Sequence, residues 1–420
     1  MSRPLRVVEI CAGAGGQALG LEKAGFEHEL AVELDAHACD TLRRNRPAWK
    51  IAEGDVADRL TWDPRSYAGV DLLAGGVPCP PFTVAGKQLG ATDERDLFAW
   101  AVELTSTVTP RALVLENVRG LSSPRFAGYR QHVLDRLAEL GYVAQWKLLH
   151  ASDFGVPQLR PRFVLVALLP EDARYFRWPQ PRGEAPSVGR ALAGQMASGG
   201  WAGAAAWSQL ANDIAPTIVG GSKKHGGADL GPTRAKRAWA QLGVDALGVA
   251  DNPPCPEDIF AVGPKLTTEM VAVLQGWQPG EWEFVGRKTA KYRQIGNAFP
   301  PPVAAAVGAS VRAALEHTGE PASDVAGNSE QDPLYRTLRT ARQRDGNTFL
   351  SHAQIQRAMG QQIEVAELER RLALLSRDFD LEISELKGAV TYRLGDFKAF
   401  VGQDLHRRHE VFALNRTRIS

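Results

Sequence analysis

The 420-residue sequence has few cysteines, no long hydrophobic run and almost no excess of charge of either sign. Its four cysteines form no C-x-x-C pair, which argues against a disulfide framework and a cysteine-rich zinc site and favours a reducing compartment. No apolar run approaches the roughly 20 residues of a membrane helix, and the first residues lack the apolar core of a signal peptide. We therefore expect a cytoplasmic protein without a metal ion or a membrane partner.

The near-neutral net charge of +1 neither requires nor excludes a nucleic-acid partner. A surface that binds DNA would have to come from local clusters of Lys and Arg. The hydrophobic content of 44% and the charged content of 23% are ordinary for a globular protein, and the length suits two or three domains.

The first third of the chain alternates short β-branched apolar runs with amphipathic stretches, which predicts an α/β fold with a mostly parallel sheet and helices on both faces. Ligands of such sheets bind beyond the carboxyl ends of the strands. The expected strands are Leu5–Ile10, Glu29–Val32, Val70–Ala74, Leu113–Glu116 and Phe163–Leu168. The expected helices are Ala18–Ala24, Asp35–Arg44, Leu97–Thr107 and Tyr129–Leu140.

From about residue 170 to 264 the periodicity is weak and Gly, Pro, Trp and Ala dominate, which indicates a second, irregular domain. Helical periodicity returns at 266–274 and 301–317, and the polar stretch 319–331 is typical of a linker. In the tail we expect helices at 333–342, 352–359 and 365–375 and a hairpin at 380–394. Three helices and a hairpin are typical of a winged helix-turn-helix; a helical appendage or a dimer interface is the alternative.

A glycine-rich loop follows the first expected strand. Gly13 and Gly15, with Ala18 in the third place, approximate the pattern that lets a backbone approach a nucleotide, and Glu33 at the next strand end could bind ribose hydroxyls. This signal is weak alone, because a tight turn beside a surface carboxylate has the same pattern.

A second loop holds Cys79 between Pro78 and Pro80, at the carboxyl edge of the sheet. The prolines restrict the backbone and keep the loop non-helical, which suits a presented nucleophile. A small buried cysteine is the alternative.

Two further segments carry polar groups near strand ends. Glu116 ends an expected strand, where it could act as an acid beside a nucleophile. The alternative is that Glu116 is a capping or surface carboxylate. Arg160 and Arg162 alternate along an extended segment, which suits recognition of an anion or a carbonyl, although a solvated basic edge has the same pattern.

The order of these motifs resembles the DNA cytosine-5 methyltransferase family, in its bacterial restriction-modification type. The resemblance covers roughly residues 5–168 and 264–310. It depends on the ordered series AGAGG, ELD, GDV, GGVPCPPF, LENV, QLRPR, LTTEMVAVLQGW and RQIGNAFPPPVAAAV. It implies a Rossmann-like S-adenosylmethionine (SAM) domain that methylates C5 of a cytosine within a specific double-stranded DNA sequence.

The resemblance assigns catalytic roles to four residues. Cys79 matches the nucleophile that attacks C6 of a flipped-out cytosine, and Glu116 matches the acid at N3, whose protonation implies a desolvated site that raises its pKa. Arg162 matches the residue that holds the base, and Arg160 supports the loop. Asp71 could help to position the Cys79 loop.

The resemblance also implies a cofactor pocket in which the glycine loop holds the methionine part of SAM, Glu33 its ribose, and Asp55 with Val56 its adenine. The full expected set is Cys11, Ala12, Gly13, Gly15, Gly16, Glu33, Asp55, Val56, Pro78, Leu97 and Asn297. Cys11 stands where the family usually has an aromatic residue, so cofactor affinity could be weaker unless Phe98 or Trp100 compensates.

The family further implies a loop that closes over DNA and a variable target-recognition domain. Their expected DNA contacts are Lys87, Gln88, Lys223, Lys224, Arg234, Lys236 and Arg237, with solvated charge as the alternative. The implied domains are 1–168 with 291–318 for catalysis, 169–290 for target recognition, 319–331 as linker, and 332–420 as a winged-helix-like domain.

The expected partner is double-stranded DNA, which associates the protein with the nucleoid. A cognate restriction endonuclease would act on the same site without direct contact. The alternatives are a tRNA cytosine-5 methyltransferase, a nucleotide-dependent oxidoreductase and an inactive DNA-binding regulator. Oxidoreductase chemistry does not require the Pro-Cys, Glu-Asn-Val and Gln-x-Arg-x-Arg motifs in this order, which disfavours that alternative. The presence of both Cys79 and Glu116 disfavours an inactive regulator.

Overall fold

The computed structural model describes residues 3–77, 95–220, 228–260, 263–323, 332–386 and 388–398. Contacts divide the chain into two units. The first comprises Met1–Val77, Thr107–Asn117 and Lys147–Asp324, and the second comprises Pro78–Ser106, Val118–Trp146 and Val325–Ser420. The domain boundaries expected from the sequence stay a prediction, because this division groups residues by contact and not by role.

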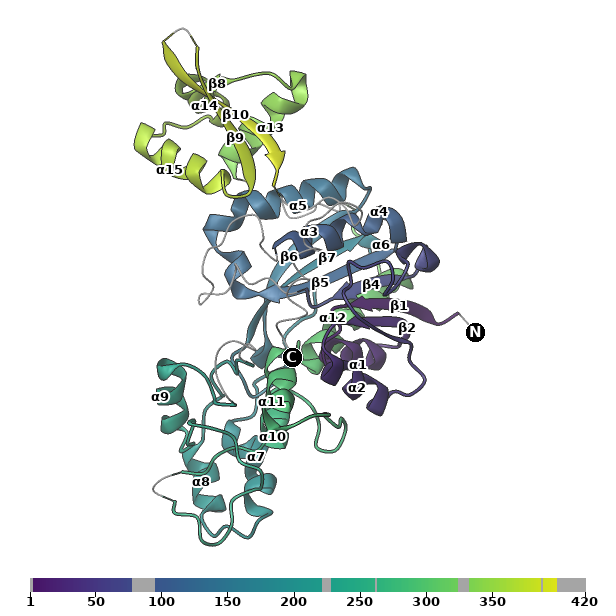
Figure 1. Ribbon diagram of the computed structural model, residues 1–420, viewed down its shortest axis with the longest axis vertical. Helices are drawn as coiled ribbons and strands as arrows, with labels where there is room; N and C mark the ends of the chain where they lie inside the picture. The colour runs from purple at the N-terminus through teal and green to yellow at the C-terminus, as the bar shows by residue number, and fades with distance from the viewer. Residues whose placement is uncertain are drawn as a thin grey trace. The chain divides into compact units, whose positions relative to one another are not determined.

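A seven-stranded sheet has the order β3-β2-β1-β4-β5-β7-β6 (Figure 1). The β1–β2, β1–β4, β2–β3 and β4–β5 pairs are parallel, which confirms the expected α/β fold. The strands are β1(Leu5–Ile10), β2(Phe26–Glu33), β3(Ile51–Glu53), β4(Leu72–Gly75), β5(Ala112–Val118), β6(Val143–His150) and β7(Pro161–Leu168). The sequence analysis missed β3 and β6.

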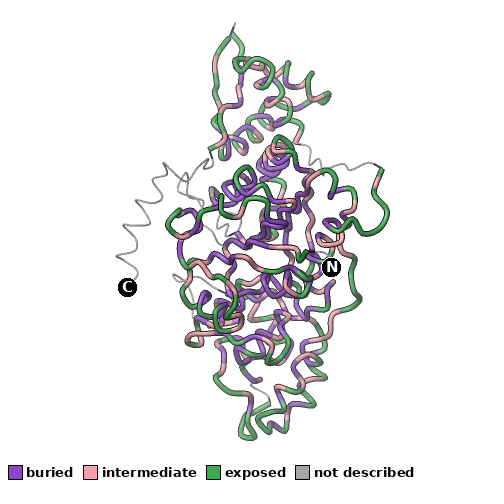
Figure 2. Tube along the Cα trace, turned by 90° about the vertical axis from the view of Figure 1, so that its right-hand side faces the viewer, coloured by how far each residue is buried: buried purple, intermediate pink, exposed green. Residues whose placement is uncertain are grey.

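Helices α1(Gly16–Lys23), α2(Ala36–Asn45) and α12(Pro301–Leu315) pack in the first unit (Figure 1). The Asp35 side chain caps α2 by accepting from two backbone N–H groups. Gly20 brings α1 close to α12, since a Cβ there would lie 2.4 Å from the Ala304 Cβ. The central strands β4 and β5 are buried along most of their length, which places the hydrophobic core at the sheet. Figure 2 colours the buried residues of the chain purple.

The stretch that was expected to be irregular contains short helices. They are α6(Pro170–Ala173), α7(Val188–Ala197), α8(Ala204–Leu210) and α9(Thr233–Gln241). After this stretch, α10(Thr268–Leu274) agrees with the helical periodicity expected at 266–274, and α11(Lys288–Asn297) was not expected. The shared core of the region holds the five buried tryptophans Trp201, Trp207, Trp239, Trp277 and Trp282. Helices α6 to α9 were missed because Gly and Pro are frequent around them and the apolar periodicity is weak.

The second unit includes α3(Arg95–Glu103) and α5(Ala127–Glu139). The single helix expected over Leu97–Thr107 is wrong, because α3 ends at Glu103 and α4(Thr105–Val108) follows. The Thr105 hydroxyl donates to the Val102 carbonyl, which competes with continued helix. Short 3-10 helices are η1(Pro64–Tyr67), η3(Arg119–Ser122), η4(Pro124–Phe126) and η5(Ala151–Phe154).

The three expected tail helices and the hairpin are present, and a short additional strand joins them. The elements are α13(Pro333–Asp345), β8(Leu350–Ser351), α14(His352–Met359), α15(Val365–Leu375), β9(Phe379–Leu386) and β10(Ala389–Phe397), with sheet order β8-β10-β9. These elements enclose a core of their own around Leu338 and Leu372. A winged-helix role on DNA remains a prediction.

The tail docks on α5. Arg339 forms ion pairs with Asp135 at 2.7 Å and with Glu139 at 2.5 Å. The rings of Phe379 and Phe397 lie 5.4 and 4.0 Å from that of His132. Among the described residues no helix has the length and apolar character needed to cross a membrane.

Candidate active site

Three neighbouring strand ends form the candidate site. Ile10 pairs with Gly75, and Gly75 pairs with Leu115, so β1, β4 and β5 end at one edge. A Cβ placed on Gly76 would lie 3.5 Å from Glu116 Oε2 and 3.8 Å from the Cys11 carbonyl oxygen. The glycine loop, the segment before Cys79 and the Glu116 carboxyl therefore meet, as the motif order predicts.

Asn117 binds Val77, the last described residue before the cysteine loop. Its buried side-chain amide donates to the Val77 carbonyl at 3.3 Å. Since side chains alternate along β5, Glu116 and Asn117 point to different sides, and both reach the segment Gly76–Val77. The sequence analysis quoted Asn117 as part of a motif but gave it no role.

Glu116 forms an ion pair with Arg162, whose Nε lies 2.5 Å from Glu116 Oε1. Only 8% of Glu116 and 9% of Arg162 are exposed. Burial raises the pKa of Glu116, although the charges of Arg162 and Arg160 oppose the rise. The site therefore favours the protonated acid more than water does.

Arg160 is fully buried and acts on the backbone. It donates to the carbonyls of Ile218, Gly296 and Ala298, each at 2.7 Å. These bonds tie the segment before β7 to the middle region and to the turn between α11 and α12. The geometry fits the supporting role expected for Arg160.

Gln158 continues the same network. Its side-chain nitrogen donates to the Gln275 side chain at 2.7 Å, and its side-chain oxygen accepts from the Ile218 backbone N–H at 2.8 Å. Gln275 in turn donates to the Ala298 carbonyl at 2.7 Å. Gln275 was missed, because a sequence does not say which buried amides will meet.

The glycine loop is joined to Glu33. The Gly13 N–H donates to Glu33 Oε2 at 2.7 Å, while Oε1 accepts from the N–H groups of Leu34 and Asp35. Burial raises the pKa of Glu33, although these backbone donors oppose the rise. Cys11 adopts a φ of 51°, a conformation that is uncommon outside glycine.

Asp55 lies beside Glu33 at the end of the neighbouring strand, because the Gly54 N–H donates to the Glu33 carbonyl at 2.9 Å. Asp55 accepts from the Ala57 N–H at 2.9 Å. Val56 is buried, and its carbonyl accepts from the Trp62 indole at 2.8 Å. The expected ribose and adenine residues thus occupy adjacent strand ends.

The glycines of the loop serve different purposes. A Cβ on Gly15 would lie 2.5 Å from the Trp282 ring, and one on Gly16 would lie 2.3 Å from the Phe299 carbonyl, so these two permit close packing within the chain. A Cβ on Gly13 would meet no other atom within 4 Å. Gly13 therefore borders open space beside Glu33, where a ligand would meet no side chain of the loop. Trp282 was not expected here.

Asn297 is exposed at the end of α11, next to the Ala298–Phe299 turn that packs on Gly16. Leu97 is buried in α3 of the second unit, so its contact with a cofactor stays a prediction. Four of the expected DNA contacts and two residues at the nucleophile lie outside the described residues: Lys87, Gln88, Lys223, Lys224, Pro78 and Cys79.

The expected positioning role of Asp71 is wrong. Asp71 lies just before β4 begins, at the opposite end of the strand from Gly76. It accepts from both terminal nitrogens of Arg3 and from the Arg6 N–H, so it holds the amino-terminal segment.

The basic residues of α9 differ in how free they are to contact DNA. Arg234 and Arg237 are exposed, three positions apart on one helix face. Lys236 is bound to Asp229 at 2.8 Å, which offsets its charge.

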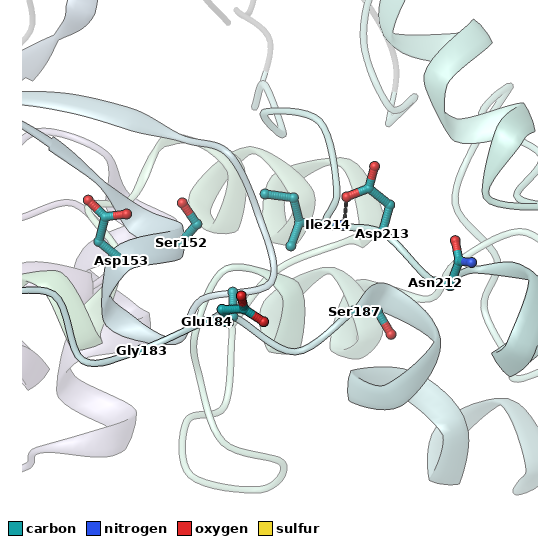
Figure 3. Close-up of a pocket in the computed structure, with 9 residues that line it drawn as sticks. Ser152, Asp153, Gly183, Glu184, Ser187, Asn212, Asp213 and Ile214 are labelled. Atoms are coloured by element: carbon teal, nitrogen blue, oxygen red, sulfur yellow. Dashed lines mark hydrogen bonds between the residues drawn. The ribbon is translucent and has the colours of Figure 1, made fainter.

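A cavity of about 370 Å³ lies elsewhere in the first unit, lined by Asp153, Glu184 and Asp213 with Ser152, Ser187 and Asn212 (Figure 3). Its carboxylates would repel phosphate. In the part of the chain that the structure describes, no group of three His, Cys, Asp or Glu side chains is arranged to hold a metal ion.

The fold and this arrangement agree with comparisons to known proteins. The family model for C-5 cytosine-specific DNA methylase matches residues 5–313. The chain belongs to the C-5 cytosine-specific DNA methylase family.

Two relatives are informative. The chain is 65% identical over 416 residues to the Type II methyltransferase M.NaeI of Lentzea aerocolonigenes, with 99% of each protein covered. It is 50% identical over 313 residues to the Type II methyltransferase M.NgoMIV of Neisseria gonorrhoeae, with 74% of this chain and 97% of that protein covered.

Solved structures show the same fold. A DNMT2 mutant from Spodoptera frugiperda matches with a TM-score of 0.51 and 17% identity, covering 73% of this chain and 99% of that one. The S. pombe Dnmt2 methyltransferase matches with a TM-score of 0.50 and 17% identity, covering 76% and 100%.

Proposed function

We propose that this protein transfers a methyl group from SAM to C5 of a cytosine within a specific sequence of double-stranded DNA, as the modification enzyme of a restriction-modification system. The observation that carries the proposal is the buried Glu116–Arg162 pair beside the Gly76–Val77 segment, which leads directly to Cys79. The names of the two Type II relatives support the substrate class.

Glu116 supplies a proton and Cys79 supplies the nucleophile. The Cys79 thiolate adds to C6 of a flipped-out cytosine while the protonated Glu116 donates to N3, which makes C5 electron-rich. Burial raises the Glu116 pKa, which favours the protonated donor more than water does. C5 would receive the methyl group of bound SAM, which leaves as S-adenosylhomocysteine. Loss of the C5 proton to solvent and return of the N3 proton to Glu116 then let the C6–S bond break, which releases the Cys79 thiolate.

Arg162 holds Glu116 and the base together. Arg162 keeps its charge and cannot act as an acid, so it suits the O2 carbonyl of the cytosine and the conjugate base of Glu116. Arg160, Gln158 and Asn117 are positioning residues, because their observed bonds go to the backbone or to other side chains of the protein.

The residues around Gly13 fit SAM, which when bound supplies the methyl group. Glu33 and Asp55 would hold the ribose and adenine, and the open space at Gly13 leaves room for the methionine part. The N–H groups at the start of α1 would bind its carboxylate. We infer that Asn297 lies at the same pocket, since its turn packs on Gly16.

The test compares transfer of labelled methyl from SAM into duplex DNA and into tRNA. The proposal expects label in DNA at C5 of cytosine, and duplexes containing 5-fluorocytosine should trap the wild-type protein covalently, because fluorine cannot leave as a proton. Cys79→Ser should abolish both results while SAM binding persists. Label in tRNA alone, or wild-type protein that forms no adduct on methylatable sequences, would overturn the proposal.

A further inference from the structure

Helix α11 carries a row of exposed or partly buried polar residues that leads to the candidate site. Thr289, Arg293 and Asn297 are four positions apart, so they lie on one face, while Tyr292 and Ile295 face the core. Asn297 ends the helix beside the turn that Arg160 holds. Arg293 is therefore one helical turn away from an expected cofactor residue.

The same face contacts the segment that precedes Lys223 and Lys224 in the sequence. A Cβ on Gly220 would lie 2.4 Å from Asn297 Oδ1 and 2.7 Å from the Arg293 carbonyl oxygen. Gly296 packs equally closely on Gly220, since a Cβ there would lie 2.5 Å from the Gly220 backbone. The middle region thus approaches the candidate site along α11.

Arg293 differs from the other arginines around the site. Arg160 and Arg162 are bound to carbonyls or to a carboxylate. Arg293 is partly buried, and it forms no hydrogen bond or ion pair with another described residue. A guanidinium keeps its charge and presents its donors in a rigid fork, so a partly desolvated arginine without an acceptor suits an anionic ligand.

Other positive charges lie close to Arg293 in the sequence, at positions that do not share its helix face. Lys291 and Arg287 lie within two turns of Arg293 on or next to α11. Lys288 differs, because it is bound to Asp251 at 2.8 Å. The carboxylates of the cavity in Figure 3 belong to other segments, at residues 153, 184 and 213.

We propose that Arg293 binds a backbone phosphate of DNA close to the target cytosine. This inference rests on the proposed function and deepens it, because it adds a contact on the catalytic side of the target-recognition region. Phosphates of a duplex come at a fixed spacing from the base that is read, so such a contact fixes the position of the DNA relative to Glu116 and Cys79.

The experiment measures duplex binding by full-length protein over a range of KCl concentrations, with S-adenosylhomocysteine present. Arg293→Gln should lower the affinity about tenfold or more at 0.15 M salt, as expected for one charge-assisted bond. The slope of log K against log salt should become shallower by about 0.9. Arg293→Lys should keep the slope, and Lys288→Gln, which removes a charge already bound to Asp251, should match wild type in both quantities.

Two further readouts separate the alternatives. Calorimetry should give wild-type affinity for S-adenosylhomocysteine in Arg293→Gln, and saturating 5-fluorocytosine duplex should trap this variant as fully as wild type. Weaker cofactor binding with an unchanged salt slope would overturn the inference and assign Arg293 to the cofactor. An unchanged slope with lower thermal stability would overturn it too. Failure of the wild type to form the adduct would instead contradict the proposed function.

Discussion

Glu116 at the end of β5 and Arg162 near the start of β7 form an ion pair of 2.5 Å in a nearly closed environment. Burial pushes the Glu116 pKa up while the guanidinium pulls it down, and burial prevails. The pair combines a carboxyl whose affinity for a proton is raised by burial with a cation that keeps its charge. A target cytosine that must be both protonated and held in place needs both of these groups.

Glu116→Gln should lower kcat by roughly 10²–10⁴-fold, the usual contribution of a positioned acid. In wild type, kcat/KM should decrease as pH rises through the raised pKa of Glu116, because the protonated form is the donor. The variant should lose this alkaline dependence. Steady-state kinetics across pH, with SAM affinity measured as a control, tests the prediction; an identical alkaline limb in both proteins would remove Glu116 from the proton transfer.

Glu33→Ala and Asp55→Ala should each weaken SAM binding by roughly 1–3 kcal/mol, the loss of a hydrogen bond to a charged group. Glu33→Ala should also loosen the glycine loop, since it removes the acceptor of the Gly13 N–H. Calorimetry measures the first effect and amide exchange at Gly13 the second. Arg44→Ala, an exposed residue of α2, is the control. Unchanged affinity in both variants would mean that the pocket lies elsewhere.

Arg160→Met should destabilise the protein by about 3 kcal/mol or more, because it leaves three buried carbonyls without their donor. Urea unfolding measures this loss. The matched control is Arg43→Met, a partly exposed arginine bound to surface carboxylates, for which we expect less than about 1 kcal/mol. A small effect at Arg160 would show that the network is not a structural support.

The pKa of His132 is lowered to about 3 by burial and by the charges of Arg339 and Arg136. The unfolded state takes up a proton near pH 6.5, whereas the folded state does so near 3, so this group costs stability as pH falls between these values. His132→Phe should make the stability less dependent on pH in that window. Thermal unfolding from pH 4 to 8 compares the two proteins, and parallel pH profiles would contradict the burial of the imidazole.

Removal of the chain from Ser329 onward should destabilise the second unit and expose the apolar side of α5. Arg339→Ala should reproduce part of this effect, about 1–2 kcal/mol, since it loses both carboxylate partners. Arg336→Ala, on the exposed side of α13, is the control. We expect the truncated protein to keep the salt slope of DNA binding; a shallower slope would instead assign DNA contacts to the tail.

The sequence predicted those parts of the fold in which local pattern and burial agree. The strand expected at Leu5–Ile10 and the tail helices expected at 352–359 and 365–375 were found with identical bounds, while α13 extends three residues beyond its expected end. Strand β6 was missed, because VAQWKLLH mixes polar and apolar residues on a partly exposed strand. The break after α3 involves the hydrogen bond of the Thr105 hydroxyl, and the apolar periodicity of the sequence does not reveal such a bond.

Of the candidate site, the sequence predicted where several motif residues lie and a support at Arg160, but not the other supports. Glu116, Arg162 and Glu33 lie where their motifs imply, because motif order and strand order coincide in a parallel sheet. Trp282 and Gln275 were not predicted, since their partners Ala14 and Ala298 are distant in sequence and only the fold brings them together.

The docking of the tail on α5 has a consequence for synthesis of the protein. Arg339 contacts Asp135 across 204 positions, so α5 leaves the ribosome long before its partner exists. During that interval His132 and its apolar neighbours have no cover from Phe379 and Phe397. M.NgoMIV, of which 97% aligns with only 74% of this chain, completes its chain within a shorter span. The nascent protein thus depends on a part made later to bury a surface made early, and chaperones would find a binding site in that interval.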